Sequence, residues 1–203
     1  MSGFNVIHDV SNELKQQVFI ALQNTPGTSF ALSAGADSIT LEAPQDNLAD
    51  QIVLSLFLYH IDIDKHLRNQ RALPDRTRDD QFRKPPLPLQ LRFLVTPMDP
   101  VAETNHSLLG RIIQHFHDTP VITALGTSPL TDSFGGASAE LRVKPDMLSL
   151  EQLSQIWNAL STPYRLSVAF LVDIVAIDSG RAPQQIGRVD EMSTASGLKE
   201  GQT

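Results

Sequence analysis

The chain has 203 residues, in which 16 lysines and arginines stand against 23 aspartates and glutamates, for a formal net charge of −7. This length suffices for one domain with a hydrophobic core, and the acidic balance argues against a protein that wraps nucleic acid or anionic membrane over its whole surface. The sequence contains no cysteine, which excludes disulfides, thiolate zinc sites and cysteine nucleophiles. The N-terminus does not have the pattern of a signal peptide, and no apolar run approaches the roughly 20 residues that span a bilayer, so we expect a soluble protein that folds in the cytoplasm.

The first half of the chain predicts one helix and two strands. Apolar residues recur at helical spacing over residues 7–22, which predicts a helix. A short alternating strand, SITLEAP, follows at residues 38–44. Residues 51–64, QIVLSLFLYHIDID, are rich in β-branched and aromatic residues and predict a strand that is buried over its first half. Residues 71–86, RALPDRTRDDQFRKPP, are polar and interrupted by proline, and we expect a loop there.

The clearest strand prediction is LPLQLRFLVTP, residues 87–97. Alternation places five apolar residues on one face of it, namely Leu87, Leu89, Leu91, Phe93 and Val95. Asp99, followed by a proline, then predicts the N-cap of a helix that ends at Thr119. Residues 130–140 are expected to form a flexible loop and residues 139–145 a short strand.

The last third of the chain predicts a helix and a central strand. Ser149 with Gln152 three residues later predicts a capping box. The helix that follows has a predicted buried face of Leu150, Leu153, Ile156, Trp157 and Leu160. Residues 165–177 are apolar on both faces apart from Ser167 and Asp173, as expected of a strand inside a sheet.

This order of elements predicts a single α+β (α/β) domain over residues 1–178, in which about three helices pack on a mixed, mostly antiparallel sheet. Residues 179–203 lack aromatic residues and periodicity. We expect them to form a flexible C-terminal tail or an arm that orders only with a partner.

One stretch, LFLYHIDIDKHLRNQ at residues 56–70, raises the question of a metal site. In a regular strand, His60, Asp62, Asp64 and His66 would share one face, and imidazole and carboxylate groups bind Zn²⁺ or Fe²⁺. Same-face residues lie roughly 6.5–7 Å apart, so the outer pair would be roughly 20 Å apart and the four could not converge. The favoured interpretation is a strand whose last residues reach water, and we expect no metal and no cofactor.

Signatures of catalysis are absent from the sequence. The chain has no nucleophile-elbow serine motif and no glycine-rich phosphate-binding loop. His115 and His117 are predicted near the end of a helix, two residues apart and therefore pointing in different directions. The unusual electrostatic feature is instead the segment from Lys65 to Lys84, where seven basic residues stand against Asp75, Asp79 and Asp80. Arginine is well suited to interfaces because its guanidinium group pairs bidentately with carboxylates.

Several blocks of the sequence resemble one known family, in the same order. They are LSLFLYHIDIDKHLRNQ, KPPLPLQLRFLVTP, HSLLGRIIQHFHDTPVI, LSLEQLSQIWNAL and YRLSVAFLVDIVAID. Together they resemble the N-terminal domain of the cap, or tail-terminator, proteins of extracellular contractile injection systems, which are phage-tail-like particles of the virulence-cassette and antifeeding-prophage type. The resemblance spans roughly residues 5–178. Its most specific pieces are Leu67-Arg68-Asn69, the proline pair before Leu87, Leu108-Leu109-Gly110-Arg111 and Tyr164-Arg165-Leu166-Ser167.

The resemblance implies a non-enzymatic structural protein. Such a cap is a ring of six copies that closes the far end of the inner tube and sheath, fixes tube length and couples the two. It implies assembly in the cytoplasm into a particle that can be released, with no membrane or nucleic-acid partner. The chain is short for such a cap, so we expect no appended C-terminal domain.

The residues expected to bind the partners lie in the basic segment, and they are Arg68, Asn69, Arg71, Arg76 and Arg78. Two other functions were weighed beside the cap. One is a metal-dependent enzyme that uses His60 and Asp62 with His115 or His117. The other is a phage head–tail connector in which the basic segment lies near DNA.

Overall fold

A computed structural model of the chain describes residues 4–65, 73–75, 78–130, 140–182 and 184–185. The elements are α1 (Val6–Gln23), the 3₁₀ turn η1 (Gly35–Ser38), β1 (Ile39–Thr40), β2 (Leu54–Ile63), β3 (Leu73–Asp75), β4 (Arg78–Arg83), β5 (Leu87–Pro97), α2 (Ala102–Asp118), β6 (Val121–Ile122), β7 (Ala124–Leu125), β8 (Ser128–Pro129), β9 (Leu141–Asp146), α3 (Leu150–Leu160), β10 (Val168–Ile177) and β11 (Gln184–Gln185).

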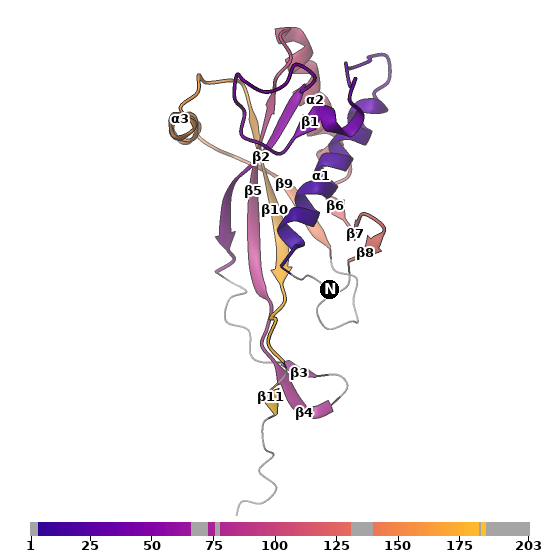
Figure 1. The fold of residues 1–203 in the computed structure, drawn as a ribbon, viewed down its shortest axis with the longest axis vertical. Helices are drawn as coiled ribbons and strands as arrows, with labels where there is room; N and C mark the ends of the chain where they lie inside the picture. Colours follow the sequence, from indigo (N-terminus) through magenta and orange to yellow (C-terminus); the bar gives the residue numbers. More distant parts are fainter. Residues whose placement is uncertain (1–3, 66–72, 76–77, 131–139, 183, 186–203) are drawn as a thin grey trace, which may run out of the picture.

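The centre of the fold is a six-stranded sheet in the order β1-β2-β5-β10-β9-β6. All neighbouring strands in it run antiparallel except β1 and β2, which are parallel. A three-stranded sheet, β11-β4-β3, lies beyond the lower ends of β5 and β10, at the far end of the molecule from the loops around η1 (Figure 1). The predicted α+β class, with three α-helices and a mostly antiparallel sheet, is confirmed.

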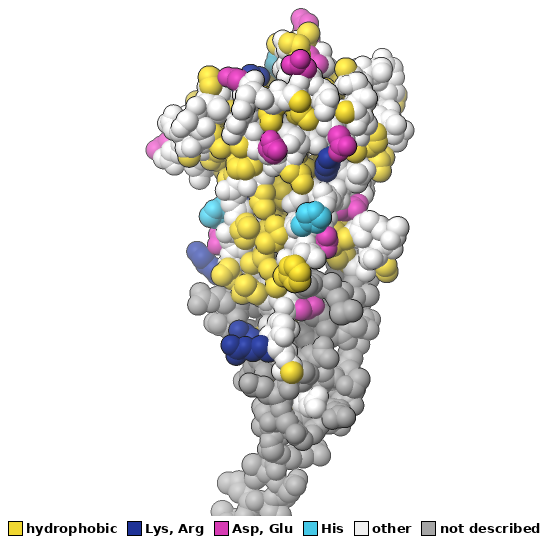
Figure 2. Space-filling model, in the orientation of Figure 1, with side chains coloured by type: hydrophobic (Ala, Val, Ile, Leu, Met, Phe, Trp, Pro, Cys, Tyr) yellow, Lys and Arg dark blue, Asp and Glu magenta, His cyan; other side chains and the backbone are white. Residues whose placement is uncertain are grey.

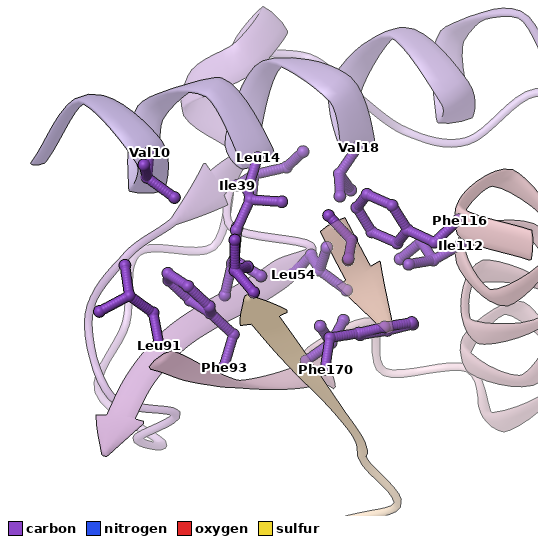
Figure 3. Close-up of a cluster of buried hydrophobic side chains, with 14 of the residues drawn as sticks. Val10, Leu14, Val18, Ile39, Leu54, Leu91, Phe93, Ile112, Phe116 and Phe170 are labelled. Atoms are coloured by element: carbon purple, nitrogen blue, oxygen red, sulfur yellow. The ribbon is translucent and has the colours of Figure 1, made fainter. Parts of the chain in front are cut away.

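The core lies between one face of this sheet and the helices α1 and α2. The buried stripe of α1 follows from the predicted spacing and includes Val10, Leu14 and Val18. In Figure 3, Val10 points toward Leu91 and Phe93 of β5, and Val18 lies beside Phe116 of α2. From α2, Phe116 packs against Phe170 of β10, with ring centroids 5.0 Å apart. The predicted apolar face of β5 is buried from Leu89 to Val95, whereas Leu87 is 42% exposed.

Residues 71–86 do not form the expected loop. They contain β3 and β4, which pair with each other, and β4 also pairs with β11 through Gln184 opposite Phe82. The expectation was wrong because these strands are polar and lack alternation, and because β11 comes from a segment far later in the chain that no local pattern reveals. Since β11 lies within the predicted tail, the proposed boundary at Asp178 stays a prediction.

Two helix predictions need correction. Asp99 is not the N-cap of α2, because that position is Val101. Asp99 instead accepts a hydrogen bond from the Val101 backbone N–H, 2.8 Å from its carboxylate oxygen, in a turn just before the helix. The capping box of α3 is present as predicted, but its predicted buried face is not, because Trp157 is its one buried residue and Leu150 is 70% exposed.

Of two short predicted strands, one is shorter in the structure than predicted and the other is confirmed. The predicted strand at residues 38–44 shortens to β1, with Ser38 in the 3₁₀ turn before it. The strand predicted at residues 139–145 is present as β9. The end of α2 is as expected, with Thr119 at its C-cap. Most of the expected loop at residues 130–140 lies outside the described residues.

Candidate assembly surface

The strand β2 forms the open side of the central sheet. Its outer neighbour β1 pairs only with Leu54 and Ser55. From Leu56 to Ile63, no described strand pairs with its outer side. Such an edge presents backbone N–H and C=O groups that can pair with a strand from another chain.

An extra residue at Tyr59 divides this strand into two halves. In the register with β5, Leu58 lies opposite Phe93 and His60 lies opposite Arg92, so Tyr59 is a β-bulge. After the bulge, Ile61 and Ile63 face the helix side of the sheet and His60 and Asp62 the other side. Unbroken alternation would place Tyr59 on the same face as the two isoleucines, but the bulge shifts the alternation by one residue and puts it on the other face.

On the side of the sheet away from α1, Tyr59 belongs to a polar network that joins strands. Its hydroxyl donates to Asp146 at 3.1 Å, and Arg92 forms an ion pair with the same carboxylate. Burial, and next the negative charge of Asp146, raise the pKa of Tyr59 to about 12, so the hydroxyl stays protonated and donates at neutral pH. A second carboxylate, Asp173, accepts from Gln90 at 3.2 Å and from Lys144 at 2.9 Å. The hydrogen-bonding and charged groups of this network are partners of one another, so the network holds neighbouring strands of the sheet together.

The candidate metal ligands are not brought together. On the polar side of β2, His60 is exposed and Asp62 is half-buried, and His66 lies outside the described residues. On α2, His117 is exposed and His115 is half-buried, with a pKa lowered by burial and then by the charge of Arg111. Among the described residues, no three His, Asp or Glu side chains are gathered in a way that could hold a metal ion.

Of the expected partner-binding residues, four lie outside the described ranges, namely Arg68, Asn69, Arg71 and Arg76. The fifth, Arg78, begins β4 and lies opposite Asp75 of β3. Its backbone is therefore in the three-stranded sheet at the end of the molecule (Figure 1). Their role in binding a partner stays a prediction.

Two arginines from the most specific blocks of the sequence have structural roles that the pattern did not reveal. The Nε atom of Arg111 donates to the backbone carbonyl oxygen of Ala21 at 3.0 Å, which joins the middle of α2 to the C-terminal end of α1. Arg165 forms an ion pair with Asp46 at 2.7 Å, which ties the start of β10 to the loop between β1 and β2. Both partners are far away in the sequence, so spacing alone could not indicate them.

The sequence prediction also missed an apolar surface. Ile61, Ile63 and Leu87 are 40–45% exposed although they face the helix side of the sheet. Alternation in β2 and β5 places these residues on the apolar face of the sheet, but only the position of α1 shows that no described helix covers them. Within the described ranges, no helix combines the length and apolarity that crossing a bilayer requires.

The family model of the Pvc16 N-terminal domain matches residues 9–191, most of the chain. The chain belongs to this family. The resemblance drawn from the sequence blocks is thereby confirmed, and the match extends past Asp178 into the predicted tail. A search of curated proteins gave no match.

Two solved structures of contractile injection systems are similar in fold to this member of the family. One is the sheath/tube terminator of the extracellular contractile injection system PVC in its extended state, with a TM-score of 0.61 and 18% identity over 97% of this chain. The other is the tube-terminating cap of the anti-feeding prophage, AFP, with a TM-score of 0.54 and 17% identity over 92% of this chain. The present chain covers 65% and 60% of the lengths of those two chains.

Proposed function

We propose that the chain is a structural cap, or tail terminator, of a contractile phage-tail-like injection particle. In this role copies of the chain form a ring, with six members by analogy to the family. The ring ends the inner tube and the sheath and couples them. The observation that carries the proposal is membership of the Pvc16 N-terminal domain family over residues 9–191, together with a terminator fold along nearly the whole chain.

The open edge of β2 supports this function physically. A terminator has to bind the last subunits of two concentric assemblies, and strand addition provides many directional hydrogen bonds without a deep pocket. The eight edge residues from Leu56 to Ile63 match the length of an ordinary strand. We propose that a terminal tube or sheath subunit adds its strand here. The protein acts by assembly in the cytoplasm, as part of a particle that can leave the cell, and it catalyses no reaction.

The basic segment contributes to the same coupling. We propose that Arg68, Asn69, Arg71, Arg76 and Arg78 pair with carboxylates of a neighbouring subunit. Truncating one partner of a buried charged pair costs roughly 2–5 kcal/mol, and a ring repeats that cost at every interface.

Particle morphology tests the function and the arginine sites separately. Cells that lack the gene should produce tubes of irregular length or sheaths detached from tubes, and the wild-type gene should restore both. The double variant Arg68→Glu, Arg71→Glu should be folded yet fail to restore them, whereas the matched charge reversal of exposed Arg142 and Arg181 should succeed. Normal particles without the gene would overturn the cap function. Normal particles with the Arg68 and Arg71 variant would overturn the site alone.

A further inference from the structure

The helix side of the central sheet has a part that no helix among the described residues covers, which we call the lower face. It consists of Leu58, Ile61, Ile63, Leu87 and Ile177. α1 begins at Val6, and Val10 already lies beside Leu91, so the sheet continues past the start of the helix (Figure 3). Figure 2 shows a patch of apolar side chains in the middle of the molecule, to the left of the lower half of α1 as Figure 1 places it. Ile61, Ile63 and Leu87 are 45%, 40% and 42% exposed there, and a contiguous apolar patch of this kind marks an interaction site.

A second apolar surface lies at α3. Its capping box fixes the start of the helix, but Leu150 and the preceding Met147 are 70% and 93% exposed. The C-terminal half of α3 is held by buried Trp157, whose ring meets that of Tyr164 edge to face with centroids 6.0 Å apart. Because the helix is already formed, docking its free end costs little ordering entropy. In Figure 1, α3 lies to the left of the upper ends of the strands, away from α1 and from the lower face.

We infer that the occupant of the lower face is the N-terminal end of α3 from a second copy of this chain. The charges around the two surfaces fit each other. Lys65 and Lys84 are exposed where β2 and β5 border the lower face, and Figure 2 shows basic side chains beside and below the apolar patch. Exposed Glu151 follows Leu150 directly, and α3 contains no basic residue. Three carboxylates are also close to the lower face, and none of them is free: Asp9 accepts a hydrogen bond from His8 at 3.2 Å, and Asp64 and Asp178, which follow Ile63 and Ile177, each make an interaction of their own.

The arrangement of the two surfaces determines the symmetry of the contact. A contact between two different surfaces of the same chain is heterologous, and its repetition closes a ring or extends a filament. A contact between two lower faces would instead stop at two copies and leave α3 uncovered. The inference therefore rests on the ring of the proposed function and names the residues that join one copy to the next.

The absence of cysteine from the chain permits a direct test by cross-linking. The double variant Leu150→Cys, Ile63→Cys, treated with a short bis-maleimide, should give covalent oligomers that end at one closed size. The matched control Leu150→Cys, Ile113→Cys places the second thiol on α2, at a residue that is similarly exposed at 42%. We expect at least about a tenfold lower yield in the control, because the contact brings Leu150 beside Ile63 at a high effective concentration and leaves Ile113 outside the interface. Equal yields from the two variants, or no cross-links in the first, overturn the inference.

Mixing two charge variants tests the heterologous contact by sedimentation. Leu150→Glu and Ile63→Glu alter exposed side chains, so each chain should fold and each should lose the ring. An equimolar mixture retains one intact contact and should form dimers but no rings. A stable dimer of either variant alone, or rings in both, overturns the inference. In the latter case the cap function stands and the lower face binds tube or sheath. Absence of the chain from particles would instead refute the cap function.

Discussion

The extra residue Tyr59 shifts the alternation of β2 by one position. Ile61 and Ile63 therefore face the helix side of the sheet, whereas the Tyr59 hydroxyl lies on the other side. The bulge is tolerated because that hydroxyl finds Asp146, which also pairs with Arg92. Replacing the carboxylate would leave an arginine without its ion-pair partner in a place that is largely shielded from water. Tyr59 thus links the edge strand β2 to β9 directly, and to β5 through the shared carboxylate of Asp146, at the point where we propose that a partner strand adds.

The raised pKa of Tyr59 predicts how stability depends on pH. The unfolded chain loses the tyrosine proton near its ordinary pKa of 10.0, whereas the folded chain keeps it until about pH 12. The unfolded state therefore binds fewer protons in this window, and the contribution of Tyr59, fully present below pH 10, is lost as the pH rises through 12. Ultraviolet titration of tyrosinate should show a step near pH 12 that disappears in Tyr59→Phe. The same step in the variant would contradict this assignment.

At the scale of elements, the sequence predicted β5, β9, β10 and the core stripe of α1 because their patterns match the faces that the fold buries. It failed for β3 and β4, which pair with each other although they are polar and lack alternation, and for the pairing of β4 with β11, a segment far later in the chain. It also failed for α3, where the apolar stripe is real but only Trp157 is buried. In that helix the pattern indicated an apolar surface correctly, but a pattern does not tell whether the surface meets its own chain or another one.

The capping box of α3 gives a prediction for this element. The Ser149 hydroxyl accepts from the backbone N–H of Gln152 at 3.2 Å, and its loss costs about 1 kcal/mol of helix stability. In Ser149→Ala, amide hydrogen exchange in α3 should therefore speed up about fivefold. The control Ser154→Ala removes only a hydroxyl that donates to the helix carbonyl of Leu150, and exchange should stay unchanged. Equally faster hydrogen exchange in both variants would refute a stabilising role for the Ser149 N-cap.

At the scale of the whole molecule, the chain divides into a sheet with its helices and a small three-stranded sheet at one end (Figure 1). Among the described strands, β11 pairs with β4 alone, so the proposed boundary at Asp178 predicts distinct effects for two shortened chains. Ending the chain at Asp178 should speed hydrogen exchange in β4, whereas ending it at Gln185 should not. Neither change should lower the unfolding temperature of the central sheet. A lower temperature for both would show that the segment after Asp178 belongs to the main domain.

The central claim is that this chain ends a contractile particle. Electron microscopy of purified particles that carry a small tag on this chain tests it most directly. We expect a single ring of tagged density at one end of each particle, in contact with both the inner tube and the sheath. Tagged density at the opposite end, along the length of the sheath, or on no particle would contradict it.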